Sequence, residues 1–305
     1  MASGEKILVL GAGELGTFVL LSLANHPRKG NSRISVLLRQ STLDTKDASK
    51  RKQLDEFQAL GIQTVAGDIE AESEDELAAK FQSFVTVIVC TGMYSPPGTQ
   101  IKFARAAISA KVKRYFPWQY GLDYDEIGRD SAQDLFTEQL DVRDILRAQS
   151  ETAWTIVSTG LFMSFLFEDF FGVVAADRKQ VTALGSWDTK VTVTDASDIG
   201  KMVAEAVFAG EELVNQVVFI AGDTISYAEL ADAVENVSSE AITRQLWAVK
   251  KLRADLASDP ENGIKKYRIV FAQGNGTAWD KSKTLNHARN IKLLDIEGWL
   301  KSHGL

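Results

Sequence analysis

Three glycines near the amino terminus have the spacing of a dinucleotide-binding turn. Gly11, Gly13 and Gly16, with Glu14 and Leu15 between them, directly follow the strand-like run Lys6–Leu10 and precede an apolar helical run. Glycines here permit a tight turn, close approach of a pyrophosphate and close helix–strand packing. The helix N-terminus adds unpaired amides and the positive end of a dipole. A glycine-rich turn that only packs is the alternative, but the placement between the first expected strand and helix favours a dinucleotide site.

The end of the second expected strand indicates which dinucleotide this site prefers. Ile34–Leu38 is followed by Arg39, and the next four residues contain no carboxylate. An NAD site usually places Asp or Glu there for the ribose 2′-hydroxyl, whereas arginine accommodates a 2′-phosphate. The planar guanidinium suits phosphate because it can donate two parallel hydrogen bonds. The sequence therefore predicts NADP(H), with Arg39 on the 2′-phosphate.

The elements that must position these residues alternate regularly through residues 1–158, the predicted NADP-binding domain. The expected strands are Lys6–Leu10, Ile34–Leu38, Gln63–Ala66, Val85–Thr91, Arg114–Phe116 and Ala153–Ser158. Helical patterns lie between them near 14–26, 47–60, 73–81, 98–111 and 131–149. This alternation is typical of a parallel sheet with helical crossovers. We predict an α/β, Rossmann-type doubly wound fold that binds its ligand at the carboxyl ends of the strands.

Residues 159–305 lose this rhythm and are expected to form a smaller, mostly α substrate-binding lobe. One buried-strand pattern near 216–221 is expected to rejoin the sheet of the first domain. The stretch 161–171 is intensely aromatic. If it is helical, Phe162 and Phe165 share a face that could line a substrate cleft, although such a stripe more often packs in a core.

Composition excludes several classes of protein. A net charge of -7 argues against binding the phosphate backbone of a nucleic acid, which needs a basic face. One cysteine and three scattered histidines indicate neither a disulfide framework nor a metal site. The first residues lead directly into a strand pattern, and the longest apolar stretch is interrupted by Glu168 and Asp169. We expect a cytoplasmic protein without a membrane span, acting as a monomer or homodimer on a small molecule.

Further motifs, in order along nearly the whole chain, resemble the NmrA-like and isoflavone-reductase-like branch of the atypical short-chain dehydrogenases. They are Leu38-Arg39-Gln40, Ala66-Gly67-Asp68, Lys113 to Pro117, Gly185 to Gly200 and Ile296 to Leu300. The resemblance implies that Arg39 and Lys50 contact the 2′-phosphate and that Asp68 and Ile69 border the adenine. It also implies that the ribose and nicotinamide are flanked by Thr91, Gly92, Phe116 and Pro117, and covered by residues 158–162.

The chain departs from this branch at the position where its reductases carry a lysine near the nicotinamide. Aligning Phe136 and the pair Val142-Arg143 places Gln139 there. Glutamine cannot act as an acid and carries no charge to stabilise an anion. The segment after the fifth strand, Pro-Trp-Gln-Tyr-Gly over 117–121, is closer to the fungal members, and no Tyr-x-x-x-Lys occurs. Arg143, one turn after Gln139, is expected to contact Gln139 or, more often for such a residue, to form a surface salt bridge.

The remaining candidates suggest hydride transfer that needs little proton donation. Transfer to an iminium carbon gives a neutral amine, whereas transfer to a carbonyl gives an oxyanion that requires a donor. Tyr120 and Asp123 are the candidate acids, with Asp125, unless these carboxylates form a solvated acidic loop. A site built from Trp118, Tyr120, Phe162 and Phe165 suits a planar, cationic aromatic molecule.

Three functions therefore remain open. The first is an NADPH-dependent reductase of secondary metabolism that acts on a conjugated C=N or C=C of an aromatic or alkaloid-like substrate. The second is a redox-neutral isomerase or cyclase, in which hydride is lent and recovered. The third is a non-catalytic NADP-sensing regulator, since some NmrA-like proteins are of this kind.

Overall fold

The computed structural model describes residues 4–304, which divide into two compact units. The first unit contains residues 4–119, 141–157 and 199–218, and the second contains 120–140, 158–198 and 219–304. The boundary expected at 158 therefore differs from the observed division in two places. Residues 120–140 fold with the second unit, and residues 199–218 return to the first.

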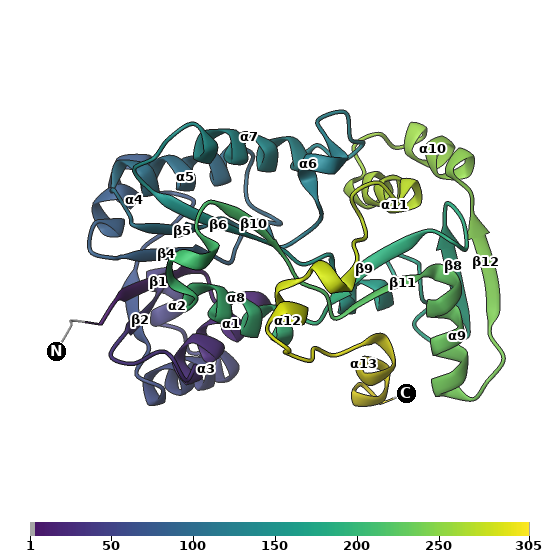
Figure 1. Ribbon diagram of the computed structural model, residues 1–305, viewed down its shortest axis with the longest axis horizontal. Helices are drawn as coiled ribbons and strands as arrows, with labels where there is room; N and C mark the ends of the chain where they lie inside the picture. Colours follow the sequence, from purple (N-terminus) through teal and green to yellow (C-terminus); the bar gives the residue numbers. More distant parts are fainter. Residues whose placement is uncertain (1–3, 305) are drawn as a thin grey trace. The chain divides into compact units, whose positions relative to one another are not determined.

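A seven-stranded sheet forms the centre of the first unit (Figure 1). Its order is β10-β6-β5-β4-β1-β2-β3, and the pairings from β3 through β6 are all parallel. The strands are β1 (Lys6–Leu10), β2 (Arg33–Leu38), β3 (Gln63–Ala66), β4 (Thr86–Val89), β5 (Arg114–Phe116), β6 (Ala153–Ser158) and β10 (Gln216–Phe219). The strand order reverses between β1 and β4, which is where such folds bind ligands. The predicted doubly wound sheet is confirmed, and β10 is the strand expected near 216–221.

Helices cover both faces of this sheet (Figure 1). On one face, α4 (Glu74–Phe81), α5 (Thr99–Ser109) and the end of α7 (Leu135–Arg147) pack on the apolar strands through Phe81, Phe103 and Leu146. On the other lie α1 (Glu14–Asn25), α3 (Ala48–Ala59) and α8 (Ala196–Val207). Gly200 lets α8 approach α1, because a Cβ there would lie 2.6 Å from the backbone carbon of Phe18. A short helix, α2 (Gln40–Leu43), follows β2.

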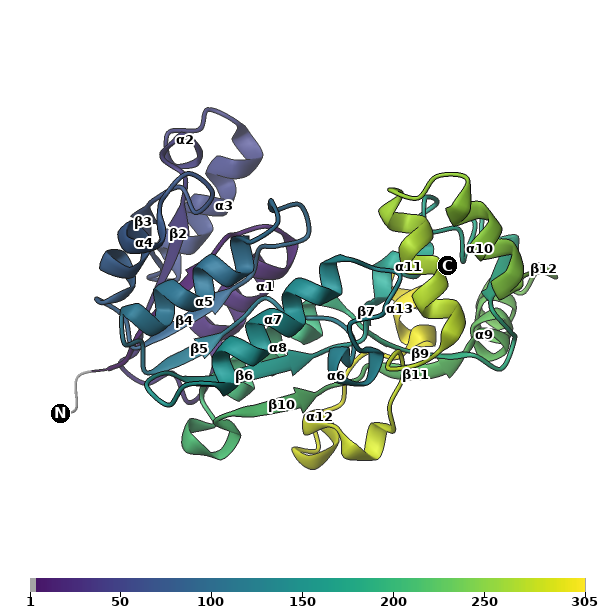
Figure 2. The same ribbon diagram turned by 90° about the horizontal axis from the view of Figure 1, so that it is seen from above.

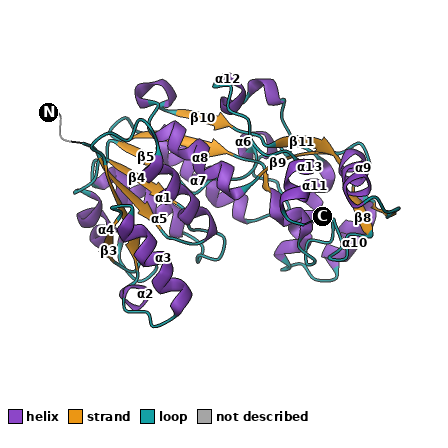
Figure 3. Cartoon of the chain, turned by 90° about the horizontal axis from the view of Figure 1, so that it is seen from below, coloured by secondary structure: helices purple, strands orange, loops and turns teal. Residues whose placement is uncertain are grey.

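The second unit combines small sheets with helices (Figure 3). One sheet has the order β11-β9-β7 and the other pairs β12 with β8. The strands are β7 (Leu161–Phe162), β8 (Gln180–Leu184), β9 (Lys190–Thr194), β11 (Asp223–Ser226) and β12 (Thr243–Trp247). The helices are α6 (Tyr124–Ile127), α9 (Tyr227–Ser238), α10 (Val249–Ala257), α11 (Gly263–Gln273), α12 (Leu285–Ala288) and α13 (Ile296–Ser302). This unit is richer in strand than the mostly α lobe that the sequence suggested.

The aromatic stretch 161–171 is not the α-helix considered above. It consists of β7 followed by a 3-10 helix over Met163–Phe167. Phe165 packs into a cluster with Phe170, Phe171 and Tyr267, at ring-centroid distances of 5.2, 4.9 and 6.2 Å. Leu161, Met163, Leu166 and Phe171 of this stretch are buried in the core of the second unit. Figure 2 shows the place of β7 in this unit.

Candidate functional site

The glycine turn lies between β1 and α1, at the carboxyl edge of the sheet. Gly11 has a φ of +92°, which an L side chain rarely adopts. A Cβ on Gly16 would lie 2.2 Å from the carbonyl oxygen of Gly11, so only glycine allows α1 to start this close to the turn. Gly13 differs from both, because no atom lies within 4 Å of the place its Cβ would occupy. The first and third glycines thus meet packing constraints, whereas the middle one faces open space.

The start of α1 is available to a ligand. Gly13 is its N-cap residue, and no side chain caps the helix. Amides in the first turn of a helix have no intrahelical acceptor, and together with the helix dipole they attract anions. Open space above Gly13 beside such amides fits the pyrophosphate of a dinucleotide. These observations support Gly11, Gly13, Glu14, Leu15 and Gly16 as the residues that would hold it.

Gln53 on α3 holds the glycine turn by hydrogen bonds, a role that the sequence did not reveal. The amide nitrogen of Gln53 donates to the Ala12 carbonyl at 3.2 Å and to Thr17 Oγ1 at 2.8 Å. Lys50, an exposed residue three positions earlier, therefore shares the α3 face directed toward the turn. Asp47 caps this helix by accepting from the Lys50 amide at 2.9 Å. The geometry is compatible with the predicted role of Lys50 at the cofactor.

Arg39 ends β2 as expected, but two carboxylates already contact it. Its Nε lies 3.3 Å from Asp68 Oδ2, and its terminal NH2 nitrogen lies 2.6 Å from Glu70 Oε2. All three side chains are nearly half exposed, so a ligand from solvent can reach this cluster. Asp68 was predicted to border the adenine, whereas Glu70 was not identified from the sequence. The acids arrive from the loop after β3, because β3 pairs with β2 in the sheet.

The loop after β3 is held by a lysine from α5. The ammonium group of Lys102 donates to the backbone carbonyls of Ile69, Glu70 and Glu72, at 2.9, 3.1 and 2.8 Å. The Asp68 carboxylate also closes its own turn by accepting from the amides of Glu70 and Ala71. The pKa of Asp68 lies below its ordinary value. The largest cause is the hydrogen bond from the Ala71 amide, and the Glu70 amide and the charge of Arg39 add to it. Asp68, Ile69 and Glu70 thus occupy fixed positions before any ligand arrives.

Replacing Lys102 by methionine should loosen this loop. Three carbonyls lose a charged donor, which should lower the free energy of unfolding by about 1–3 kcal/mol. Urea denaturation would measure this change, and hydrogen exchange at the amides of 69–72 should accelerate. The exposed Lys113, which has no side-chain partner among the described contacts, offers the control Lys113→Met. Equal stability of the two variants would show that the carbonyl contacts contribute nothing to the loop.

The ends of β4 and β5 meet beside a tryptophan. A Cβ on Gly92 would lie 2.3 Å from Cδ2 of Trp118, so the indole ring covers this glycine directly. Gln100 donates to the carbonyl of Thr91 at 3.1 Å, which fixes the end of β4. The structure therefore brings Thr91, Gly92, Pro117 and Trp118 to one edge of the first unit. Trp118 is partly buried.

Arg143 is buried, so the surface position expected for it was wrong. The residue is fully buried, and its Nε donates to Oε1 of Gln119, also buried, at 2.8 Å. A buried guanidinium is stable only with such hydrogen-bonding partners. The contact fixes the residue that follows Trp118. Gln119 is thus a positioning residue for the β5 end that sequence reasoning missed.

The predicted catalytic and aromatic substrate residues mostly belong to the second unit. Gln139 is fully buried and Tyr120 is 7% exposed. Asp123 caps α6, accepting from the Glu126 amide at 3.4 Å, and its own amide donates to Gly276. This capping role favours the structural interpretation of Asp123 over that of a proton donor. Phe162 is partly buried, and Phe165 packs in the aromatic cluster described above.

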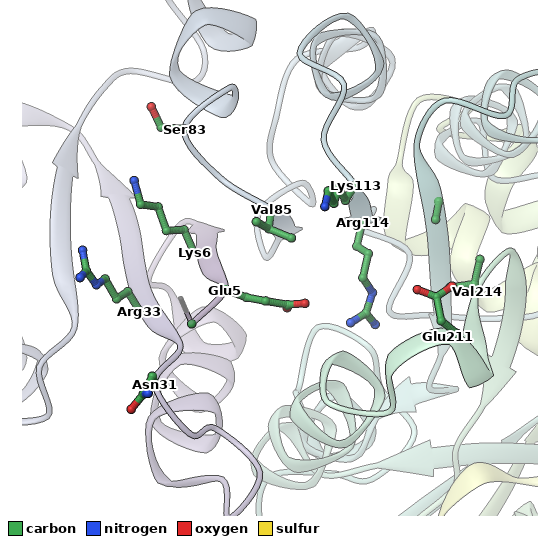
Figure 4. Close-up of a pocket in the computed structure, with 12 residues that line it drawn as sticks. Glu5, Lys6, Asn31, Arg33, Ser83, Val85, Lys113, Arg114, Glu211 and Val214 are labelled. Carbon is green, nitrogen blue, oxygen red and sulfur yellow. The ribbon is translucent and has the colours of Figure 1, made fainter. Parts of the chain in front are cut away.

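A separate pocket of about 990 Å³ opens at the amino ends of the strands in the first unit (Figure 4). Because the glycine turn lies at the carboxyl ends, this pocket is not the candidate cofactor site. Arg114 in its wall donates to the Ala206 carbonyl at 3.1 Å, and burial lowers the pKa of its guanidinium. The lining mixes cations with the carboxylates of Glu5 and Glu211, so its charge selects no class of ligand.

The described residues, 4–304, contain no candidate metal site and no candidate membrane span. Within this range no three His, Cys, Asp or Glu side chains gather as a metal site would require. No helix in the same range is both long and apolar enough to cross a membrane.

Comparisons with known proteins agree along the whole chain. A family model described as the NmrA-like family matches residues 3–299. An NmrA-like family domain-containing oxidoreductase from Gibberella moniliformis is 49% identical over 99% of both chains. An isoflavone reductase homolog from Solanum tuberosum is 27% identical, over 92% of this chain and 91% of its own. A solved structure containing NADP+ and (+)-pinoresinol has a TM-score of 0.82 at 18% identity, over 99% of both chains.

Proposed function

This chain belongs to the NmrA-like family, and we propose that it is an NADP(H)-dependent reductase. We infer that it delivers hydride to a conjugated C=N or C=C of an aromatic or alkaloid-like substrate of secondary metabolism. The observation that carries the cofactor assignment is the open space at Gly13, beside an uncapped helix start and an arginine at the end of β2. The relative from Gibberella moniliformis, named as an oxidoreductase, supports the reaction class.

Different residues of the first unit would bind different parts of the cofactor. The glycine turn and the α1 amides would bind the pyrophosphate, and Arg39 with Lys50 would bind the 2′-phosphate. Asp68 and Ile69 would border the adenine, and Thr91, Gly92 and Pro117 the ribose and nicotinamide. When bound, NADPH would supply the hydride. Trp118, packed on Gly92, would offer an aromatic face to the substrate.

The chain offers few side chains that could donate a proton to the substrate. Gln139 is fully buried and cannot act as an acid. Asp123 is engaged as a helix cap and Asp125 is exposed in the first turn of α6, which leaves Tyr120 as the candidate donor. Hydride addition to an iminium gives a neutral amine directly, so such a substrate needs no proton donor. The shortage of acidic side chains therefore favours a C=N group.

The buried Gln139 also favours a second candidate function, redox-neutral isomerisation or cyclisation. A site without an acid can lend hydride and recover it while the substrate rearranges. The two functions differ in whether NADPH is consumed, so they can be separated by stoichiometry.

The deciding experiment uses NADPH deuterated at C4, in separate pro-R and pro-S forms, with a panel of polycyclic iminium and enone metabolites. Mass spectrometry follows the products, and absorbance follows NADPH. The expected products carry one deuterium from one of the two labelled forms, with NADPH consumed in step. An iminium gains this hydride alone, and an enone gains a proton from solvent as well. Product formation without net NADPH loss would establish the redox-neutral function. No turnover despite tight NADPH binding would leave a non-catalytic NADP-sensing regulator.

A further inference from the structure

The guanidinium of Arg39, which would bind the 2′-phosphate, is already paired with an acidic residue. Glu70 Oε2 lies 2.6 Å from the terminal nitrogen of Arg39, which is a short, charge-assisted hydrogen bond. Asp68 Oδ2 lies 3.3 Å from Nε of the same guanidinium. A phosphate that binds Arg39 through this terminal nitrogen must therefore compete with Glu70 and remain close to both carboxylates.

Glu70 is held at this place by the fold. Lys102 binds the carbonyl of Glu70 itself and those of Ile69 and Glu72. The amide of Glu70 donates to Asp68 Oδ1 at 3.1 Å. Because both backbone groups of Glu70 are bound, its backbone cannot move away when a phosphate arrives. Only the side chain can rotate, and its exposed fraction of 44% leaves room to do so.

We propose that Glu70 is a specificity-determining residue that competes with the 2′-phosphate for Arg39 and so reduces the preference for NADPH over NADH. This inference rests on the proposed NADP(H) site. A phosphate monoester carries a charge of about -1.5 to -2 at pH 7, so it is repelled by a carboxylate whose backbone is fixed beside it. NADH carries a hydroxyl at this position and has no such repulsion. Glu70 therefore weakens the binding of NADPH and leaves the binding of NADH unchanged.

The test compares wild-type protein with Glu70→Gln by titration calorimetry against NADPH and NADH. Glutamine keeps the size of the side chain and removes its charge. NADPH affinity should rise about fivefold, the effect of roughly one nearby charge at an exposed site, while NADH affinity changes less than twofold. The gain should shrink as salt is raised from about 0.01 M to 0.5 M, because screening shortens the range of the repulsion.

Controls separate this role from a general effect of charge. Asp75→Asn removes an exposed carboxylate from the first turn of α4 and should leave both affinities unchanged. In an Arg39→Ser background there is no guanidinium to compete for, so Glu70→Gln relieves only the repulsion between carboxylate and phosphate, and the gain in NADPH affinity should differ from that in wild-type protein.

Three outcomes would overturn the inference. Unchanged NADPH affinity in Glu70→Gln would show that no competition exists. A loss of NADH affinity without a gain for NADPH would instead make Glu70 a ligand of the ribose hydroxyl. If neither protein binds NADPH, the proposed function fails and the inference fails with it, which is a result distinct from the other two.

Discussion

Arg39→Ser should weaken NADPH binding by roughly 10- to 150-fold, which corresponds to the loss of about 1.5–3 kcal/mol from a hydrogen-bonded charge. Serine removes the guanidinium that the 2′-phosphate would bind and leaves Asp68 and Glu70 facing the ligand without a cation between them. NADH affinity should change little, because its ribose carries no phosphate. Fluorescence titration with the two cofactors measures both constants.

Two further variants make this result specific. Arg39→Lys keeps the charge but loses the planar fork, so its NADPH affinity should fall between those of wild type and Arg39→Ser. Arg33→Ser removes an exposed arginine from the other end of β2 and should leave both cofactors unaffected. Equal losses for NADPH and NADH in Arg39→Ser would mean that Arg39 supports the fold of the site and does not recognise the 2′-phosphate.

Sequence patterns predicted the first unit well because its signals are local. The strands β1, β3, β5 and β6 begin and end where they were predicted, and the glycine spacing identified the turn at Gly11. The contacts around Arg39 were not predictable in the same way. Glu70 lies 31 residues from Arg39 and Lys102 lies a further 32 from Glu70, so no periodicity joins them. Only the order of the strands in the sheet brings these residues together.

The second unit was predicted less well because tertiary packing overrides local pattern there. The apolar run at 161–171 is compatible with a helix, yet it forms β7 and a 3-10 turn whose rings fill a core. The helix α11 was missed, although it has readable signals in its N-cap Asn262 and its C-cap Gly274. Arg143 was misplaced because a charged residue on a helix is usually exposed, and its partner Gln119 lies on another element.

Gly16→Ala should have the other large effect, through the backbone. The new Cβ would lie 2.2 Å from the Gly11 carbonyl oxygen and 3.3 Å from Cys90 Cβ. Neither the Gly11 backbone nor the buried Cys90 side chain can yield easily, so α1 must shift away from the turn. Such overpacking should lower the free energy of unfolding by roughly 1–3 kcal/mol. A helix displaced by about 1 Å should weaken NADPH binding by about 100-fold, because its amides no longer meet the pyrophosphate.

Gly13→Ala provides the matched comparison that distinguishes a packing effect from a binding effect. Its Cβ would meet no protein atom within 4 Å, and the backbone φ of -71° suits alanine. The variant should therefore unfold at a urea concentration no lower than that of wild type, as should Gly263→Ala, whose Cβ also enters open space. Only Gly13→Ala should lose NADPH affinity, because its methyl group would occupy the volume assigned to the pyrophosphate. If Gly13→Ala binds NADPH as wild type does, the open space belongs to solvent and the cofactor lies elsewhere.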